Sequence, residues 1–217
     1  MRCGHSKSVY GSILIGIVSL LLPVASWFKW LPLDFTEALG FATGAVCVWL
    51  VALNNIWNWP VGLANNIFFA VLFWKAQLYA DFGLQGVYLI LGVYGWWKWL
   101  HGGANHSLLP ISRTTGREWA IIAVFLIGGT WGLRELLIAV NGAAPMWDSI
   151  TTVLSLAAQF LLCRKRIENW ILWIMADLIY VPLYVSKNLP LTALLYAGFI
   201  VLCVIGWRSW RKEMATT

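Results

Sequence analysis

The chain has 217 residues, of which 60% are hydrophobic and only 11% are charged, and its formal net charge is +6. This composition lies far from that of a soluble domain and is typical of a protein embedded in a bilayer. The longest connection between apolar segments runs from about residue 101 to 117. No soluble catalytic domain fits into a connection of that length.

Several apolar segments are long enough to cross a bilayer, which requires about 17 to 25 residues. The first follows Arg2 and Lys7 in the manner of a signal peptide, but it lacks a convincing small-residue cleavage site, so we expect it to remain as a helix. In chain order the predicted spans are about 11–29, 38–56, 60–79, 82–100, 118–139, 147–164, 167–186 and 190–208. The sequence therefore predicts an all-α polytopic membrane protein with eight transmembrane helices.

The distribution of basic residues predicts the orientation, because Lys and Arg accumulate in cytoplasmic loops. A cytoplasmic N-terminus places eleven of the 15 basic residues inside, and only Lys29, Lys75, Arg134 and Lys187 fall outside. Both termini are then cytoplasmic. Since the basic residues lie at helix ends and form no separate domain, we read the net charge as a topology signal and expect no nucleic-acid partner.

An internal repeat organises the chain. Asn58-Trp59 recurs as Asn169-Trp170, and GWWKW at 95–99 recurs as GWRSW at 206–210, both 111 positions later. Each repeat unit spans three helices, and the single helix between the units gives them the same orientation, as in parallel transporter repeats. The predicted 1+3+1+3 organisation comprises a tail and extra helix (1–36), a first bundle (37–100), a cytoplasmic loop and linker helix (101–146), a second bundle (147–210) and a C-terminal tail (211–217).

Most tryptophans lie near predicted span ends, where an indole buries its ring and keeps its N–H hydrated. We therefore interpret them as interfacial anchors, Trp59, Trp99, Trp170 and Trp210 included. The four cysteines show no CxxC pairing, and the three histidines lie in terminal or loop positions. These residues indicate neither a disulfide nor a metal site, and we expect no cofactor.

One predicted span carries an acidic and aromatic stripe. Trp173, Asp177, Tyr180 and Tyr184 are spaced four, three and four residues apart and so share one helix face. An ionisable group within hydrocarbon is costly and usually marks a ligand pathway. The plain alternative is that Asp177 pairs with a polar group on a neighbouring helix and only orients the bundle. A cationic or hydrogen-bond-rich ligand is the sharper interpretation.

Further polar residues occur in both repeat units, and parallel repeats place a substrate path between the two bundles. Taken singly, each such side chain is more often a contact between helices than a ligand contact. Several polar stripes that converge on one interface favour a binding site. The candidate residues in addition to the stripe are Asn65, Asn66, Gln85, Tyr88, Gln159 and Tyr196.

Six sequence blocks carry a family resemblance. They are NWPVGLANN (58–66), LYADFGLQGVY (78–88), YGWWKW (94–99), MWDSITTVLSLAAQ (146–159), RKRIENWILW (164–173) and LPLTALLY (189–196). Together they resemble the PnuC family of bacterial vitamin transporters over about residues 37–210. The resemblance implies a SWEET-like fold of 3+1+3 helices, a homotrimer in the bacterial cytoplasmic (inner) membrane, and facilitated diffusion of a B-type vitamin. It also implies that the vitamin is most often nicotinamide riboside, which a cytoplasmic kinase traps by phosphorylation.

The resemblance also implies site residues, namely Gln85 and Tyr88 of the LQxxY block, Asn65, and Trp173 of the ENWxLW block. The chain departs from the pattern at Asp177, where nicotinamide riboside carriers such as the enterobacterial ones have Asn. Nicotinamide riboside has a cationic pyridinium ring, so an ionised Asp177 gains Coulomb attraction, whereas a protonated Asp177 mimics the amide donor. The departure keeps thiamine, also a cation, as a competitor. Riboflavin is neutral and larger, and it has less need of the carboxylate.

Two other classes of function stay open at this level. A membrane-embedded enzyme would use Asp177 as a general base, but the sequence offers no intramembrane His, no paired carboxylate in the same unit and no metal-ligand cluster. A scaffold protein has no need of polar stripes in both repeats. No GxxxxGK[ST] loop is present, which excludes an intrinsic ATPase. A single intramembrane acid is compatible with proton coupling without requiring it.

Overall fold

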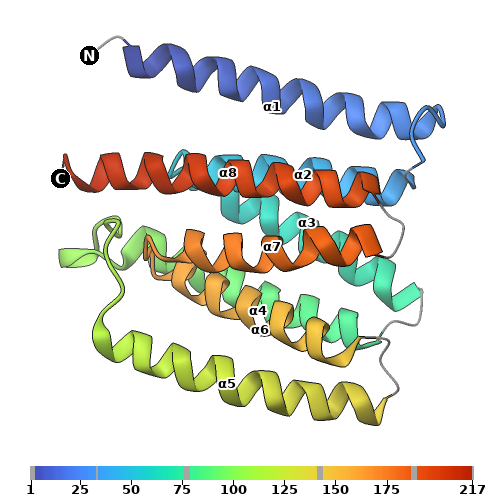
Figure 1. Ribbon diagram of the computed structural model, residues 1–217. Helices are drawn as coiled ribbons and strands as arrows, with labels where there is room; N and C mark the ends of the chain where they lie inside the picture. Colours follow the sequence, from blue (N-terminus) through green and yellow to red (C-terminus); the bar gives the residue numbers. More distant parts are fainter. Residues whose placement is uncertain (1–2, 33, 76–78, 141–143, 187–189, 217) are drawn as a thin grey trace. The chain divides into compact units, whose positions relative to one another are not determined.

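The computed structural model describes residues 3–32, 34–75, 79–140, 144–186 and 190–216, which form α-helices joined by short loops (Figure 1). Each predicted span coincides with one of these helices, and the described residues contain no strand beyond an isolated bridge between Ser112 and Arg166. The all-helical prediction is confirmed. The helices are α1 (Cys3–Trp27), α2 (Phe35–Ala52), α3 (Asn58–Lys75), α4 (Tyr79–His101), α5 (Gly116–Ala139), α6 (Pro145–Cys163), α7 (Asn169–Ser186) and α8 (Pro190–Met214), with a 3-10 turn η1 at Ala104–His106.

Among the described residues, four helical segments are long and apolar enough to cross a membrane: α5, α6, α7 and Thr192–Met214 of α8. Gly11–Trp27 and Ala38–Ala52 are shorter apolar helical segments. The chain is therefore a helical membrane protein. Among the described helices, α3 and α4 belong to neither group, and α3 carries the polar amides of Asn58, Asn65 and Asn66.

The chain divides into two compact units, Met1–Gly92 and Val93–Thr217, and the boundary falls within α4. In unit 1, α1 packs against α2, and α2 packs against α3. The indole of Trp49 on α2 donates a hydrogen bond to the hydroxyl of Ser12 on α1 at 3.1 Å. Asp34 caps the N-terminus of α2, because its side chain accepts the backbone N–H of Thr36.

In unit 2, α6 packs against both α5 and α7, and α7 packs against α8. Small residues on α6 and α7 let the helices approach closely, because Ala158 and Ala176 are both completely buried. The core of unit 2 lies between α5, α6 and α7, and it consists of Ile122, Leu154, Ala157, Ala158, Leu161, Leu172 and Ala176. Trp173 and Tyr180 pack against its edge. This core fixes the rotation of α7 about its own axis.

Matching turns precede α3 and α7. Asn54 and Lys165 both have a positive φ, of 54° and 53°. In each turn the amide nitrogen of the first helical Asn donates to a backbone carbonyl three residues earlier at 2.6 Å, from Asn58 in one case and from Asn169 in the other. Both helices begin and end 111 positions apart. The turn that begins each of these helices is thus built in the same way in the two halves of the chain.

The anchor interpretation is wrong for four tryptophans. Trp59, Trp99, Trp170 and Trp210 are exposed by only 3%, 1%, 1% and 0%. Trp210 packs against Trp99 and Trp170 at ring-centroid distances of 5.9 and 5.5 Å. The ring of Trp170 lies against Gly206, where a Cβ would come within 2.4 Å of it. Sequence position near a helix end did not distinguish these core residues from exposed ones such as Trp27.

Candidate functional site

The stripe predicted on α7 forms on one side of that helix. Trp173, Asp177, Tyr180 and Tyr184 all lie within the single helix α7, so their spacing places them one above another. Trp173 and Tyr180 are partly buried and pack against the core between α5, α6 and α7. Asp177 is only 6% exposed. The face that carries the stripe is therefore turned into unit 2.

Tyr196 on α8 completes an aromatic cluster with the stripe. The ring of Tyr196 lies 4.8 Å from that of Tyr180 and 5.1 Å from that of Tyr184, measured between centroids. Tyr180 and Tyr184 are themselves stacked at 5.9 Å. The planes of Tyr184 and Tyr196 differ by only 18°. We call Tyr180, Tyr184 and Tyr196 the tyrosine cluster. It offers flat faces and hydroxyl groups at one place between two helices.

Asp177 lies next to this cluster without a cation to neutralise it. Within the described part of the chain, its carboxylate has no hydrogen-bond or ion-pair partner. The side chains of Tyr180, Tyr196 and Cys203 lie near this carboxylate, within the range of electrostatic interaction. A buried carboxylate without a partner is costly, so buried charges are normally paired. This arrangement is suited to a ligand that brings its own positive charge.

The plain alternative for Asp177 was a structural pair with a neighbouring helix, and the described residues of unit 2 do not provide that pair. The ion pairs in this unit join Arg134 to Glu135, and Glu118 to two arginines. None of them involves α7 at the depth of the tyrosine cluster. No metal site is evident there either, since the described residues contain no group of three His, Cys, Asp or Glu side chains suited to a metal ion.

The polar residues predicted in the first repeat lie in unit 1. Asn65 on α3 is already engaged, because its amide donates to the hydroxyl of Thr43 and to the carbonyl of Gly40 at 3.5 Å. Asn66, Gln85 and Tyr88 are half-buried. Gln159 on α6 of unit 2 is also half-buried. The structure brings together Asp177 and the tyrosine cluster, and the convergence of the other residues on the same site stays a prediction.

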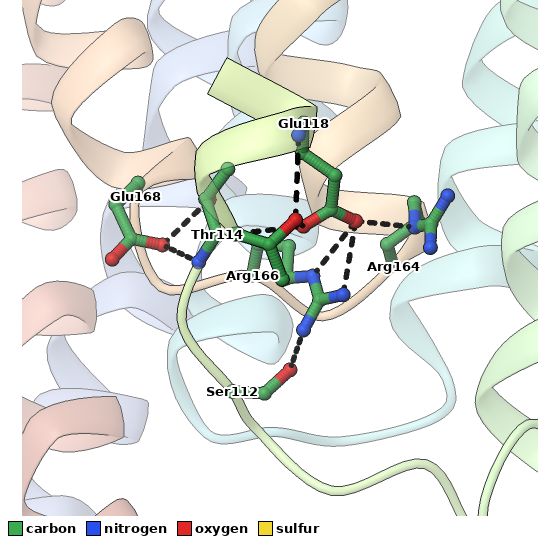
Figure 2. Close-up of polar contacts among 7 residues, drawn as sticks. Ser112, Thr114, Glu118, Arg164, Arg166 and Glu168 are labelled. Atoms are coloured by element: carbon green, nitrogen blue, oxygen red, sulfur yellow. Dashed lines mark hydrogen bonds and ion pairs between the residues drawn. The ribbon is translucent and has the colours of Figure 1, made fainter. Parts of the chain in front are cut away.

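A second polar cluster, at the start of α5, was not anticipated. Figure 2 shows one oxygen of Glu118 that accepts hydrogen bonds from Arg166 and forms an ion pair with Arg164. The nearest nitrogen–oxygen distances are 2.9 Å to Arg166 and 3.0 Å to Arg164. The other oxygen accepts the backbone N–H of Thr115 at 2.8 Å and completes a capping box. This cluster ties the start of α5 to the turn between α6 and α7. The Thr-x-x-Glu pattern at 115–118, just before an apolar run, was the signal available in the sequence.

Glu168, at the end of the same turn, is held by the loop before α5. Its carboxylate accepts both the backbone N–H and the hydroxyl of Thr114, at 2.8 and 2.7 Å (Figure 2). Arg166 also donates to the hydroxyl of Ser112 at 2.6 Å. The loop at 107–115 is thereby fastened to the α6–α7 turn through side chains and through the bridge between Ser112 and Arg166.

Comparison with known proteins adds the family. A family model described as "Nicotinamide mononucleotide transporter" matches residues 34–212. The nicotinamide riboside transporter PnuC of Escherichia coli K12 is 28% identical over 82% of this chain and 85% of its own length. The riboflavin/roseoflavin transporter RibM of Streptomyces davaonensis is 24% identical over 81% of this chain and 84% of its own length. The crystal structure of the vitamin B3 transporter PnuC matches with a TM-score of 0.72 at 25% identity, over 98% of this chain and 93% of that one.

These matches agree with the resemblance read from the sequence blocks. PnuC transporters are multi-pass proteins of the bacterial inner membrane, and the apolar helices of this chain are suited to the same setting. The matched family consists of transporters, so the expectation of a carrier and not an enzyme is confirmed. The chain belongs to the nicotinamide mononucleotide transporter family.

Proposed function

We propose that this protein carries nicotinamide riboside across the bacterial inner membrane by facilitated diffusion. The single observation that carries the proposal is the buried Asp177 carboxylate, which has no cation partner among the described residues and lies beside the tyrosine cluster. Nicotinamide riboside combines a flat cationic ring with ribose hydroxyls and an amide. The names of two kinds of relative, the E. coli transporter and the vitamin B3 transporter structure, support the same substrate class.

In the proposed complex the pyridinium ring lies against an aromatic face of Trp173 or of the tyrosine cluster, where cation–π attraction adds to the contact area. Asp177 stands near the positive charge. Asn65, Asn66, Gln85, Tyr88 and Gln159 are the proposed hydrogen-bond partners of the ribose and the carboxamide. Because two of the amide donors of Asn65 are engaged by unit 1, its carbonyl oxygen is the atom we assign to the ligand.

Riboflavin is the second candidate, and thiamine remains a third. The three close tyrosine rings offer a larger flat surface than a pyridinium ring needs, which favours an isoalloxazine ring as well. The relative RibM is described as a riboflavin/roseoflavin transporter. The unpartnered Asp177 weighs against riboflavin, because a neutral ligand leaves the carboxylate without compensation. Thiamine, a cation, satisfies that requirement.

The proposed carrier has two parallel three-helix repeats, α2–α4 and α6–α8, joined by the linker helix α5. The matching turns before α3 and α7 support this organisation. Alternating access then follows from movement of one repeat against the other around a fixed site. Both termini are proposed to be cytoplasmic and the assembly a homotrimer, with substrate trapped by a cytoplasmic kinase. If a C-terminal reporter enzyme that functions only on the outer face of the membrane were active, this topology would be contradicted.

The test is uptake by proteoliposomes that contain the purified protein. Radiolabelled nicotinamide riboside should equilibrate across the membrane without ATP, and it should be recovered chemically unchanged. Excess unlabelled nicotinamide riboside should compete more strongly than riboflavin. Liposomes without protein supply the background. Uptake of riboflavin alone would move the assignment to the second candidate, and conversion of the substrate would refute a carrier altogether.

A further inference from the structure

A cavity of about 260 Å³ opens in unit 2, at the end where loop 107–115 meets the α6–α7 turn. It lies outside the tyrosine cluster, and the proposed transport mechanism does not use it. Its lining comes from the loop, from the α6–α7 turn, from the first turn of α7 and from the last turns of α8. The residues are Arg113, Ile167, Glu168, Ile171, Trp207 and Arg211.

Two guanidinium groups line this cavity without a counter-ion. Arg113 and Arg211 are exposed, and the described part of the chain offers neither of them a carboxylate within ion-pair distance. By contrast, Arg164 and Arg166 nearby share the carboxylate of Glu118. The two pairs of arginines therefore differ in kind, since one pair is neutralised inside the structure and the other is available to a ligand.

The one acid in the lining is turned to another partner. Glu168 accepts two hydrogen bonds from Thr114 through the same oxygen, at 2.8 and 2.7 Å, and Figure 2 shows this carboxylate directed toward Thr114. These bonds hold the acid in the wall and disperse its charge. Two arginines against one bonded carboxylate leave the cavity with a net positive charge. A guanidinium group can bind two oxygens of a phosphate or of a carboxylate at once, through two parallel N–H donors.

The remaining lining is apolar and lies at the end of membrane-spanning helices. Trp207 is half-buried in the last part of α8, and Ile171, in the first turn of α7, is 40% exposed. Indole rings at such positions sit at the level of lipid headgroups. Basic pockets between helices at the cytoplasmic surface are suited to the headgroups of anionic lipids. Two arginines suited to phosphate recognition and an apolar wall thus occur in one cavity.

We propose that this cavity binds the phosphate group of an anionic phospholipid, with Arg113 and Arg211 as its ligands and Trp207 and Ile171 against the glycerol and acyl region. A soluble phosphate monoester offers the same phosphate chemistry, so the experiment must separate the two sources. The site is independent of which vitamin is carried. Its proposed effect is to bind lipid and stabilise unit 2 from the loop side.

The test compares the protein in nanodiscs of phosphatidylcholine with and without phosphatidylglycerol, by native mass spectrometry of retained lipid and by thermal unfolding. Loss of each arginine should weaken phosphatidylglycerol binding about tenfold, on the scale of one hydrogen bond between charged groups. Arg113→Gln and Arg211→Gln are the variants. Arg208→Gln is the matched control, because Arg208 is an exposed arginine of the same helix α8 that does not line the cavity.

A third arm adds inorganic phosphate to the protein in phosphatidylcholine alone. Stabilisation by phosphatidylglycerol, lost in both cavity variants and kept in Arg208→Gln, supports the lipid as the source. Stabilisation by inorganic phosphate with the same variant pattern supports a soluble phosphate instead. Arg211→Lys keeps the charge and removes the guanidinium fork, so it should retain part of the phosphatidylglycerol binding. Partial binding by this variant shows that a substitution at position 211 leaves the protein folded. Equal lipid retention by all variants, or equal losses in the control, overturns the proposal.

Discussion

Replacement of Asp177 by Asn tests the proposed cation site most directly. The substitution preserves the size and shape of the side chain and removes only its capacity to carry charge. Asp177 is 6% exposed and stands beside Tyr180 and Tyr196 on the inner side of α7. Since no cation among the described residues pairs with it, the loss of its charge should disturb the protein without ligand less than it disturbs the complex.

The expected magnitude follows from the position of the carboxylate. At an effective dielectric constant of about 20, two unit charges about 4 Å apart attract by roughly 4 kcal/mol. Removal of water from the ligand cation offsets much of this attraction, and the Asn amide restores part of the hydrogen bonding. We expect a net loss of about 1.4 kcal/mol, which is roughly tenfold in Kd for nicotinamide riboside or thiamine. Riboflavin, which is neutral, should bind no worse.

The assay is calorimetric titration of the purified protein over a range of pH. Affinity of the original protein for the cationic ligand should fall at acidic pH, because a protonated carboxyl no longer attracts it, and the Asn variant should be flat. Glu135→Gln is the control, a carboxylate-to-amide change at a side chain that is 65% exposed and pairs with its neighbour. Unchanged binding by the Asn variant together with a pH-independent affinity of the original protein would show that Asp177 acts as a neutral donor, and the charge argument would fail.

Three further predictions concern ligand binding, helix packing and the pH dependence of stability. Trp173→Ala should weaken vitamin binding by about 1–3 kcal/mol, the scale found for bases that stack on aromatic side chains. Trp131→Ala, which removes a 55% exposed ring, should leave the measured Kd unchanged. Equal losses of affinity in the two variants would refute the stacking role of Trp173. Gly206→Ala should lower the melting temperature, because the new Cβ would lie 2.4 Å from the buried indole of Trp170. Gly198→Ala should leave the melting temperature unchanged, because a Cβ there meets no neighbouring side chain within 4 Å. Equal melting temperatures of the two variants would contradict the packing described. Burial lowers the pKa of Lys165 from its ordinary 10.5 to about 8, so between these pH values the unfolded chain binds more protons than the folded one. The free energy of unfolding should therefore increase as the pH rises through this range, by at most about 3 kcal/mol. Thermal unfolding of Lys165→Met should lack this increase, and a pH profile parallel to that of the original protein would refute the prediction.

Much of the architecture was accessible from the sequence, because the signals involved are local. Hydropathy over a window the length of a helix located each α-helix of the described residues. Most helix ends moved by four residues or fewer, but α1 begins eight residues earlier and α8 ends six residues later than predicted. The 111-residue offset predicted a repeat of three-helix units, and the matching turns before α3 and α7 have the same offset. The four-three-four spacing placed Trp173 and Asp177 on one face of α7, since a helix repeats every few residues whatever surrounds it.

Only the tertiary structure determined which side chains of other helices contact each helix face. Tryptophans near helix ends look alike in sequence, yet Trp27 is 68% exposed whereas Trp210 is fully buried between two other indoles. Tyr196 was only one polar candidate among several until α8 brought its ring within 5.1 Å of Tyr184. Glu118 gained two arginine partners from a turn 46 and 48 positions away in the chain.

The reason is physical. Hydropathy and helical spacing are properties of consecutive residues, and they determine that this chain enters a bilayer as helices and that Asp177 shares a face with aromatic rings. Whether that carboxylate is neutralised depends on side chains from other helices, whose rotation is set by close packing of small residues such as Ala158 and Ala176. Packing left Asp177 buried and without a cation in the described residues, and no pattern within α7 alone could determine that.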